Sequence, residues 1–244
     1  MKKFLIILSV IILGAVIYFD FSDDNYEGKK IVPKEVATAA HEALSFYPKL
    51  DSVHIRFEFK DEIGNNFMQA LPEVSTLFKD GSKRTYLVKM TRLMEVNGLD
   101  VPIDKIPHEV LVGWFAHELG HVMDYLNRGG FNMAWFGANY WMSEAFKVRA
   151  ERRADMIAIR HDCAEELIST KEYILNNASL PEAYLEKIER LYLSPERVLE
   201  IVEEIKEDRE EILETLWEIY DIRARTNRSL SLWPVRINTF KLWA

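Results

Sequence analysis

Apolar and polar side chains alternate between residues 52 and 93, which is the pattern of half-buried β-strands. From Val53 to Phe59 every second side chain is apolar, and His54 falls on the solvent face of that strand. The segments IGNN and DGSK interrupt the alternation and predict turns. We therefore expect three or four short strands that form a small antiparallel sheet.

Helical spacing of apolar residues dominates the rest of the chain. A segment with two prolines and an aromatic-rich stretch, GGFNMAWFGANYWM, separate the helical runs, and both predict loops. The sequence thus predicts an α+β fold in which the sheet packs on the second helix and a mostly helical part follows from about residue 168. The expected helices cover residues 34–47, 108–128, 142–167 and 195–225.

The first twenty residues differ from the rest. Lys2 and Lys3 precede an unbroken apolar run from Phe4 to Phe19, whose length suits either a spanning helix or the core of a signal peptide. Small residues are missing where a signal peptide would be cleaved, so the pattern favours an uncleaved anchor over a cleaved signal. Basic residues before the run and acidic residues after it place the remainder of the chain outside the cytoplasm.

The expected organisation is therefore a membrane anchor at residues 1–20, a polar linker at 21–33 and one domain at 34–244. Cleavage of the first segment would instead give a secreted protein. The chain has 244 residues and a net charge of −8, which disfavours nucleic acid as a partner because phosphates would be repelled. Cys163 is the only cysteine, so neither an intramolecular disulfide nor a thiolate metal cluster can form, and we expect a buried, unreactive thiol.

The segment HELGH lies within the helix that precedes the aromatic-rich stretch. His117 and His121 lie one turn apart on the side opposite the apolar stripe, and such a pair brings two imidazoles close enough to bind one metal ion. Glu118 is rotated by about 100° from His117, which suits a general base beside the metal. Gly120 weakens the helix, and the close approach of another backbone or of a substrate would explain its presence.

Two histidines and a water leave a tetrahedral zinc ion one protein ligand short. The next helix offers Glu144, Glu151, Asp155 and His161. Glu151 is favoured because Ala154 is small enough to let the two helices pack closely, and because Asp155 is placed to accept the free ring N–H of a zinc-bound histidine. The other three residues stay alternatives, and a solvated helix with Glu–Arg pairs explains the same residues without a metal.

HELGH followed by a second helix with the pattern E-x-x-A-D resembles the gluzincin group of zinc metallopeptidases, in a match over about residues 108–165. The similarity is strongest to the membrane-associated CAAX-prenyl-protease and HtpX-like enzymes, and looser to the ImmA-type peptidases. It implies a zincin-like fold, zinc bound by His117, His121 and Glu151, and Glu118 as the catalytic base. The CAAX-type enzymes have several membrane segments, whereas this chain has one.

The resemblance implies hydrolysis of a peptide or protein substrate, whose extended chain adds to an edge strand by main-chain hydrogen bonds. Residues 85–92 are the candidate edge strand, with an interior strand as the alternative; Tyr125, Tyr140 and His161 are candidates for stabilising the oxyanion. The aromatic-rich stretch would line a pocket, act as a lid, touch the membrane or cap the core. Two other functions stay open: an anchored, non-enzymatic protein with a structural metal site or interaction surface, and a zinc hydrolase with a non-peptide substrate.

Overall fold

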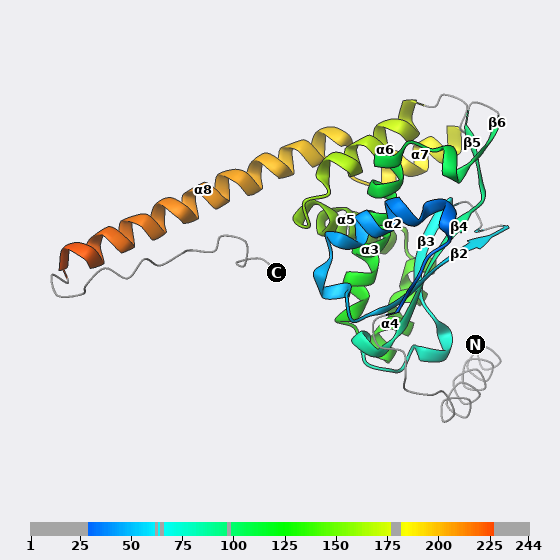
Figure 1. Ribbon diagram of the computed structural model, residues 1–244, viewed down its shortest axis with the longest axis horizontal. Helices are drawn as coiled ribbons and strands as arrows, with labels where there is room; N and C mark the ends of the chain where they lie inside the picture. Colours follow the sequence, from blue (N-terminus) through cyan, green and yellow to red (C-terminus); the bar gives the residue numbers. More distant parts are fainter. Residues whose placement is uncertain (1–28, 62, 64–65, 97–98, 177–181, 227–244) are drawn as a thin grey trace. The chain divides into compact units, whose positions relative to one another are not determined.

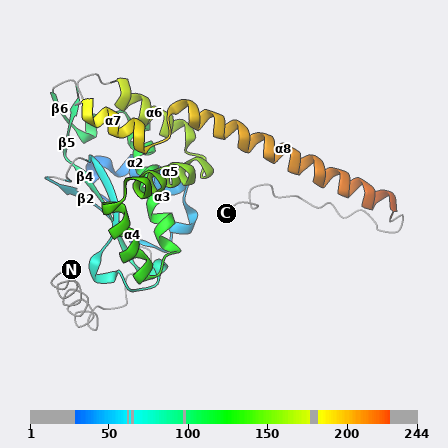
Figure 2. The same cartoon turned by 180° about the vertical axis from the view of Figure 1, so that it is seen from behind.

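The computed structural model describes residues 29–61, 63, 66–96, 99–176 and 182–226 (Figures 1 and 2). The expected anchor at residues 1–20 and most of the expected linker lie outside the described residues. The chain divides into two compact units between Pro195 and Glu196. Among the helices in the described ranges, none has both the length and the apolar composition needed to cross a membrane.

Four strands of the first unit form one mixed sheet in the order β1–β2–β4–β3. β1 (Lys30–Ile31) and β4 (Thr85–Thr91) both run parallel to β2 (His54–Lys60), and β3 (Met68–Pro72) is antiparallel to β4. The expected antiparallel sheet is therefore wrong. The chain does reverse between β2 and β3 and again between β3 and β4, but β4 inserts between the other two strands and so lies parallel to β2.

β4 is an interior strand, so the candidate edge strand at residues 85–92 is also corrected. It pairs with β2 on one side and with β3 on the other, and Tyr86, Leu87 and Val88 are buried in succession. Consecutive apolar residues suit a strand that is covered on both faces. The strand whose edge lies beside the helices is β3, which packs against α3 (His108–Leu126).

α3 is the central helix of this unit, and every side chain from Val110 to Val122 is buried. It packs against α2 (Ala37–Ser45), β3, α5 (Glu144–Arg160) and α6 (Ala164–Asn176). On the sheet side, the ring of Phe115 meets that of Phe57 of β2 edge to face, with ring centroids 5.5 Å apart. A helix enclosed in this way presents its polar side chains to the protein interior, where they need partners.

The aromatic-rich stretch, expected as a loop, is the helix α4 (Gly130–Met142). Met133 and Phe136 are buried three residues apart on one side of it, and Phe136 packs edge to face on Tyr125 and Phe146. Burying each of these side chains stabilises the helix by about 1.5–3 kcal/mol. That gain exceeds the penalty of about 1 kcal/mol for the interior glycine, Gly137, which explains why the glycine-rich composition was misleading.

The helix expected over residues 142–167 is divided into two. α5 ends at Arg160 and α6 begins at Ala164, and between them Asp162 has a φ of 61°, which an α-helix does not accommodate. Cys163 lies in this break and is fully buried. The expected burial of the thiol is confirmed, but the expected helical conformation at this residue is wrong.

The remaining elements are short. The segment expected as a loop before α3 contains a hairpin of β5 (Leu93–Val96) and β6 (Leu99–Pro102), and α7 (Glu182–Leu191) follows α6. Short 3₁₀ turns occur at Lys34–Val36, Pro48–Leu50, Val74–Thr76, Gly81–Lys83 and Ile103–Lys105.

The described part of the second unit is α8 from Glu196 onward; the whole helix spans Pro195–Thr226, in agreement with the helix expected at 195–225. Arg197 forms ion pairs with Glu200 and Glu204, one and two turns further along the same helix. Two apolar residues of its distal half, Ile212 and Leu216, are 45% and 40% exposed.

Candidate metal centre

α3 places His117, Glu118 and His121 in the interior, each no more than 6% exposed. The two imidazole rings are one helical turn apart, and their centroids are separated by 4.9 Å with nearly perpendicular planes. Because the helix is surrounded by α5, α6 and β3, these rings project toward neighbouring elements and not into solvent.

α5 brings Glu151 against the two rings, and a close helix contact makes this possible. A Cβ atom added to Gly120 would lie 2.6 Å from the carbonyl oxygen of Ala154, closer than real Cβ contacts allow. Glycine on α3 and alanine on α5 therefore let the two backbones approach. The sequence analysis noted Gly120 and Ala154 for separate reasons, and the structure shows that they contact each other.

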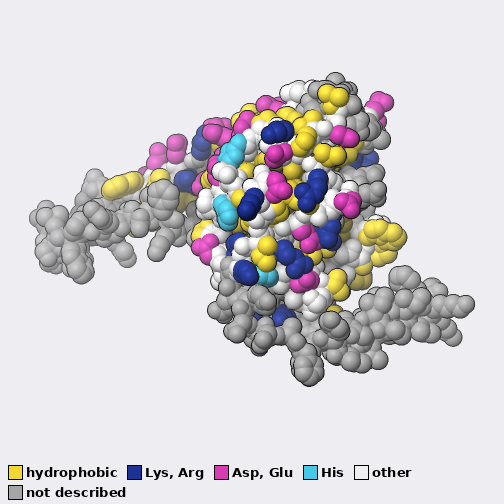
Figure 3. All heavy atoms as spheres, turned by 45° about the vertical axis from the view of Figure 1, so that its right-hand side comes forward, with side chains coloured by type: hydrophobic (Ala, Val, Ile, Leu, Met, Phe, Trp, Pro, Cys, Tyr) yellow, Lys and Arg dark blue, Asp and Glu magenta, His cyan; other side chains and the backbone are white. Residues whose placement is uncertain are grey.

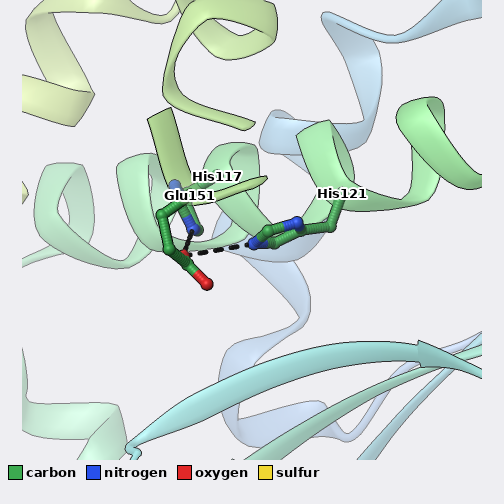
Figure 4. Close-up of side chains that lie close together, drawn as sticks. All are labelled: His117, His121 and Glu151. Atoms are coloured by element: carbon green, nitrogen blue, oxygen red, sulfur yellow. Dashed lines mark hydrogen bonds and ion pairs between the residues drawn. The ribbon is translucent and has the colours of Figure 1, made fainter. Parts of the chain in front are cut away.

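The geometry of this cluster fits a tetrahedral metal ion. The Oε2 atom of Glu151 lies 3.1 Å from Nε2 of His117 and 3.3 Å from Nε2 of His121 (Figure 4). Ligands about 2.0–2.1 Å from a tetrahedral ion are separated by about 3.3–3.4 Å. The three ligand atoms lie within 4.8 Å of one another, so this buried His–His–Glu group could hold a metal ion.

Asp155 orients one of the two imidazoles. Its Oδ1 atom lies 2.8 Å from Nδ1 of His117, and its Oδ2 atom accepts hydrogen bonds of 2.9 Å from both the Lys171 ammonium and the backbone N–H of Leu193. With Nδ1–H donating to the carboxylate, the lone pair of the ring is on Nε2, which faces Glu151. Asp155 therefore supports the cluster from behind, where the sequence placed it.

The buried charges of this region call for a cation. Glu118, Glu151 and Asp155 are buried around the two histidines, and the one ammonium buried with them, that of Lys171, pairs with Asp155, so positive charge at the centre of the cluster is favoured. Burial by itself lowers the pKa of His117, but hydrogen bonds with Asp155 and Glu151 outweigh it and raise that pKa to about 10. The shift shows how strongly the carboxylates favour a positive charge at this position.

Glu118 lies outside the three-residue cluster and faces the sheet edge. Its Oε2 atom accepts a hydrogen bond of 2.6 Å from the backbone N–H of Ala70 in β3. Burial raises the pKa of Glu118, and the two histidines and the Ala70 N–H only partly oppose this. A carboxylate with a raised pKa beside a candidate metal site is suited to accept and release protons.

A groove of about 870 Å³ between β3 and α4 leads to this cluster, and Glu118, His121 and Glu151 are among its lining residues. Its volume is within the range of ligand pockets, which run from about 300 to 1,000 Å³. A second cavity, of about 40 Å³, adjoins His117 and Glu118 and has room for a few water molecules.

Tyrosines surround the groove end of the cluster. The Tyr140 hydroxyl of α4 donates to the second carboxylate oxygen of Glu151, and the Tyr125 hydroxyl makes a long hydrogen bond to the Ala70 carbonyl. The Tyr192 ring lies 5.3 Å from that of His117. Burial holds the pKa values of all three phenols well above 10, so they are neutral hydrogen-bond donors at physiological pH.

The structure separates the other candidates from the cluster. Glu144 is exposed at the start of α5 and pairs with Arg190. His161 caps the far end of α5, where its ring stacks on that of Tyr47 and its Nδ1 bonds to a backbone carbonyl. Neither belongs to the group that could bind a metal ion.

Lys171 and Tyr192 were not singled out from the sequence. For Lys171 a signal was present, because it shares the buried side of α6 with Leu167, Thr170 and Ile174, and a lysine on such a side indicates a buried acidic partner. Tyr192 lies after α7 in a segment without helical or strand spacing, so no pattern marked it.

Comparison of the chain with family models, with curated proteins and with solved structures gives no match.

Proposed function

We propose that this protein is a zinc-dependent metallopeptidase in which His117, His121 and Glu151 hold the metal and Glu118 is the general base. The observation that carries the proposal is the convergence of these three ligand atoms within 4.8 Å, at the end of a groove whose lining includes His121, Glu151 and Glu118. A purely structural metal site has no use for a buried carboxylate beside the ligands.

The donor set favours zinc. Two imidazole nitrogens and one carboxylate oxygen, with a position left for water or substrate, make up a common catalytic zinc site. When bound, a zinc ion would polarise the scissile carbonyl and lower the pKa of water.

Glu118 moves the proton in the proposed reaction. Hydrolysis adds the oxygen of water to the carbonyl carbon and breaks the C–N bond, and Glu118 carries one proton of that water to the leaving amine. Tyr140 and Tyr192 are neutral phenols at the groove end of the cluster and are suited to donate to the developing oxyanion.

The edge of β3 suits an extended peptide. The backbone N–H of Thr91 donates to the Phe67 carbonyl, and the backbone N–H of Glu73 donates to the Thr85 carbonyl. The backbone groups of every second residue, counted from Phe67 to Glu73, therefore face β4. The backbone groups of Ala70 consequently face the groove, where Glu118 and Tyr125 now engage them. A substrate chain that adds to this edge would replace the hydrogen bonds of Glu118 and Tyr125 to the Ala70 backbone with its own, and would pass beside Glu118.

The test is metal analysis combined with peptide hydrolysis by the full chain. We expect stoichiometric zinc and turnover in the wild type, zinc without turnover in Glu118→Gln, and loss of zinc in Glu151→Ala. Matched controls are Glu109→Gln, an exposed acid on the same helix as Glu118, and Glu144→Ala, an exposed acid on the same helix as Glu151. Both controls should retain zinc and turnover.

Two results would contradict the proposal. Zinc retained at full affinity by Glu151→Ala would exclude the proposed ligand set. Zinc binding with no hydrolysis of any member of a peptide library, together with hydrolysis of an ester or amide of another kind, would identify a hydrolase of a non-peptide substrate.

A further inference from the structure

One side of α4 exposes large apolar side chains. Phe131, Trp135 and Met142 recur along it at spacings of four and seven residues and are 78%, 66% and 67% exposed, and the adjacent Trp141 is 86% exposed. We call these four residues the α4 outer face. α4 contains no charged residue, whereas acidic and basic side chains are interspersed over the face of the protein in Figure 3. Large apolar side chains exposed together on a helix without charged residues indicate a binding surface.

Packing on the opposite side of α4 holds this orientation. Met133 and Phe136 are buried, and the Arg128 guanidinium lies over the Phe136 ring at 4.5 Å. Turning the outer face inward would expose both buried side chains, at a cost of about 1.5–3 kcal/mol each. The aromatic residues therefore stay directed outward.

α4 begins at the end of the sheet where the N-terminal part of the chain arrives. Across the sheet, Lys30 of β1 pairs with Ile55 of β2, Ile55 pairs with Tyr86 of β4, and Tyr86 pairs with Pro72 of β3. Lys30 and Pro72 are therefore about 14 Å apart, at ~4.8 Å per strand. From Pro72 the chain runs on to Phe78, whose ring contacts that of Phe131 at 5.4 Å. Figures 1 and 2 show α4 at this end of the sheet, away from β5 and β6.

The sequence upstream of this point contains the apolar run from Phe4 to Phe19, which we expect to enter a membrane. The residues between that run and Lys29 number nine, and a chain of that length spans at most about 30 Å. A membrane-inserted run would therefore keep this end of the sheet, and α4 with it, close to the bilayer surface.

We propose that the α4 outer face binds the surface of a lipid bilayer, with its aromatic side chains at the boundary between headgroups and acyl chains. Tryptophan and phenylalanine on an interfacial helix are suited to this depth. Because α4 lacks basic residues, apolar burial drives the binding, so a zwitterionic bilayer suffices and salt has little effect. The inference is independent of the proposed peptidase activity.

Binding in this orientation would have a consequence for the groove. Ala134 and Trp141 of α4 line it together with β3. The groove would then open at the membrane surface, where it would receive polypeptide segments that emerge from the bilayer.

The experiment uses the full chain reconstituted in phosphatidylcholine vesicles. Single-cysteine variants Trp135→Cys and Leu99→Cys, in a Cys163→Ala background, carry a fluorescent label. The two positions are matched, since Trp135 is 66% and Leu99 68% exposed, but Leu99 lies in the separate hairpin of β5 and β6, away from α4 (Figure 1). We expect several-fold stronger quenching by nitroxide-bearing lipids at position 135 than at 99, and the reverse order with aqueous iodide.

Equal quenching at the two positions, or failure of the chain to associate with the vesicles, would overturn the proposal. Shielding of position 135 that grows with protein concentration and is independent of lipid would assign the surface to a second copy of the chain instead. Phe131→Cys provides a second reporter on the same face if Trp135→Cys does not fold.

Discussion

The contact between α3 and α5 gives a quantitative prediction for Gly120→Ala. The added Cβ would lie 2.6 Å from the Ala154 carbonyl oxygen, and ordinary contact begins at 3.4 Å, so the helices must separate by about 0.8 Å. Overpacking of this kind costs about 1–3 kcal/mol, and the better helix propensity of alanine returns about 1 kcal/mol. We expect a net loss of about 0–2 kcal/mol in the free energy of unfolding.

The same displacement should weaken metal binding. Glu151 lies one turn before Ala154 on α5, so it moves with the helix, and metal–ligand distances tolerate only about 0.2 Å. We expect zinc affinity to fall at least about tenfold, as when groups that support metal ligands are removed. Urea unfolding in EDTA measures the stability, and competition with a chelating dye measures the affinity.

Gly137→Ala is the matched control. A Cβ at this position of α4 meets no atom within 4 Å, so the substitution should raise stability by about 0.5–1 kcal/mol through helix propensity alone. The two glycine-to-alanine changes should thus have opposite signs. Stabilisation by Gly120→Ala, with unchanged zinc affinity, would show that the helices are not held at the distance described.

Four further predictions concern groups around α5 and α6. Burial lowers the pKa of His161 below 6.5. Its neutral ring therefore contributes stability above pH 6.5, and this contribution is lost as the pH falls through the lowered pKa. In EDTA, His161→Phe should lose less free energy of unfolding than the wild type between pH 7 and 5. Burial raises the pKa of the Cys163 thiol, so a thiol reagent at pH 8 should label it only on unfolding, and rapid labelling of the native chain would be inconsistent with its position. Ser143→Ala removes the cap of α5 and should lower the free energy of unfolding by about 1 kcal/mol in urea titrations, without loss of zinc. Lys171→Met leaves Asp155 buried without its ammonium partner and should cost about 3–5 kcal/mol in the same assay, whereas a change near zero would mean that Asp155 is not charged.

Local patterns in the sequence predict the elements that carry the candidate site. The period-two alternation from Val53 onward corresponds to β2, and the helical spacing around HELGH corresponds to α3. In β2 the pattern follows from which face is buried, whereas in α3, which is buried on all sides, apolar residues such as Phe115 face the sheet and the two histidines face Glu151 of α5. The approach of α5 to α3 could be inferred because a helical glycine and a downstream alanine each call for a close neighbour.

The strand order could not be inferred in the same way. Turn sequences show where the chain reverses, but they do not show which strand becomes the neighbour, and β4 occupies the place beside β2 that a hairpin would give to β3. The run of buried residues Tyr86, Leu87 and Val88 was the available sign of an interior strand.

α4 was missed because its glycines and aromatic residues resemble a loop in composition. Tertiary packing stabilises it as a helix, because the Phe136 ring packs against Tyr125 of the preceding helix α3 and Phe146 of the following helix α5. The buried side of α6 indicates an acidic partner for Lys171, but the partner is identified as Asp155 only when both helices are placed.

The order of the ligands along the chain also bears on how the protein assembles. His121 and Glu151 enclose about 30 residues, and the whole of α4 lies inside that stretch. An ion bound by both residues would need the two ends of this stretch held together, and by the chain-entropy relation used for disulfide crosslinks, closing a stretch of this length costs the unfolded chain roughly 3–4 kcal/mol. Loading of the ion and ordering of α4 would then be coupled events, so that chelation loosens one wall of the groove along with the centre itself.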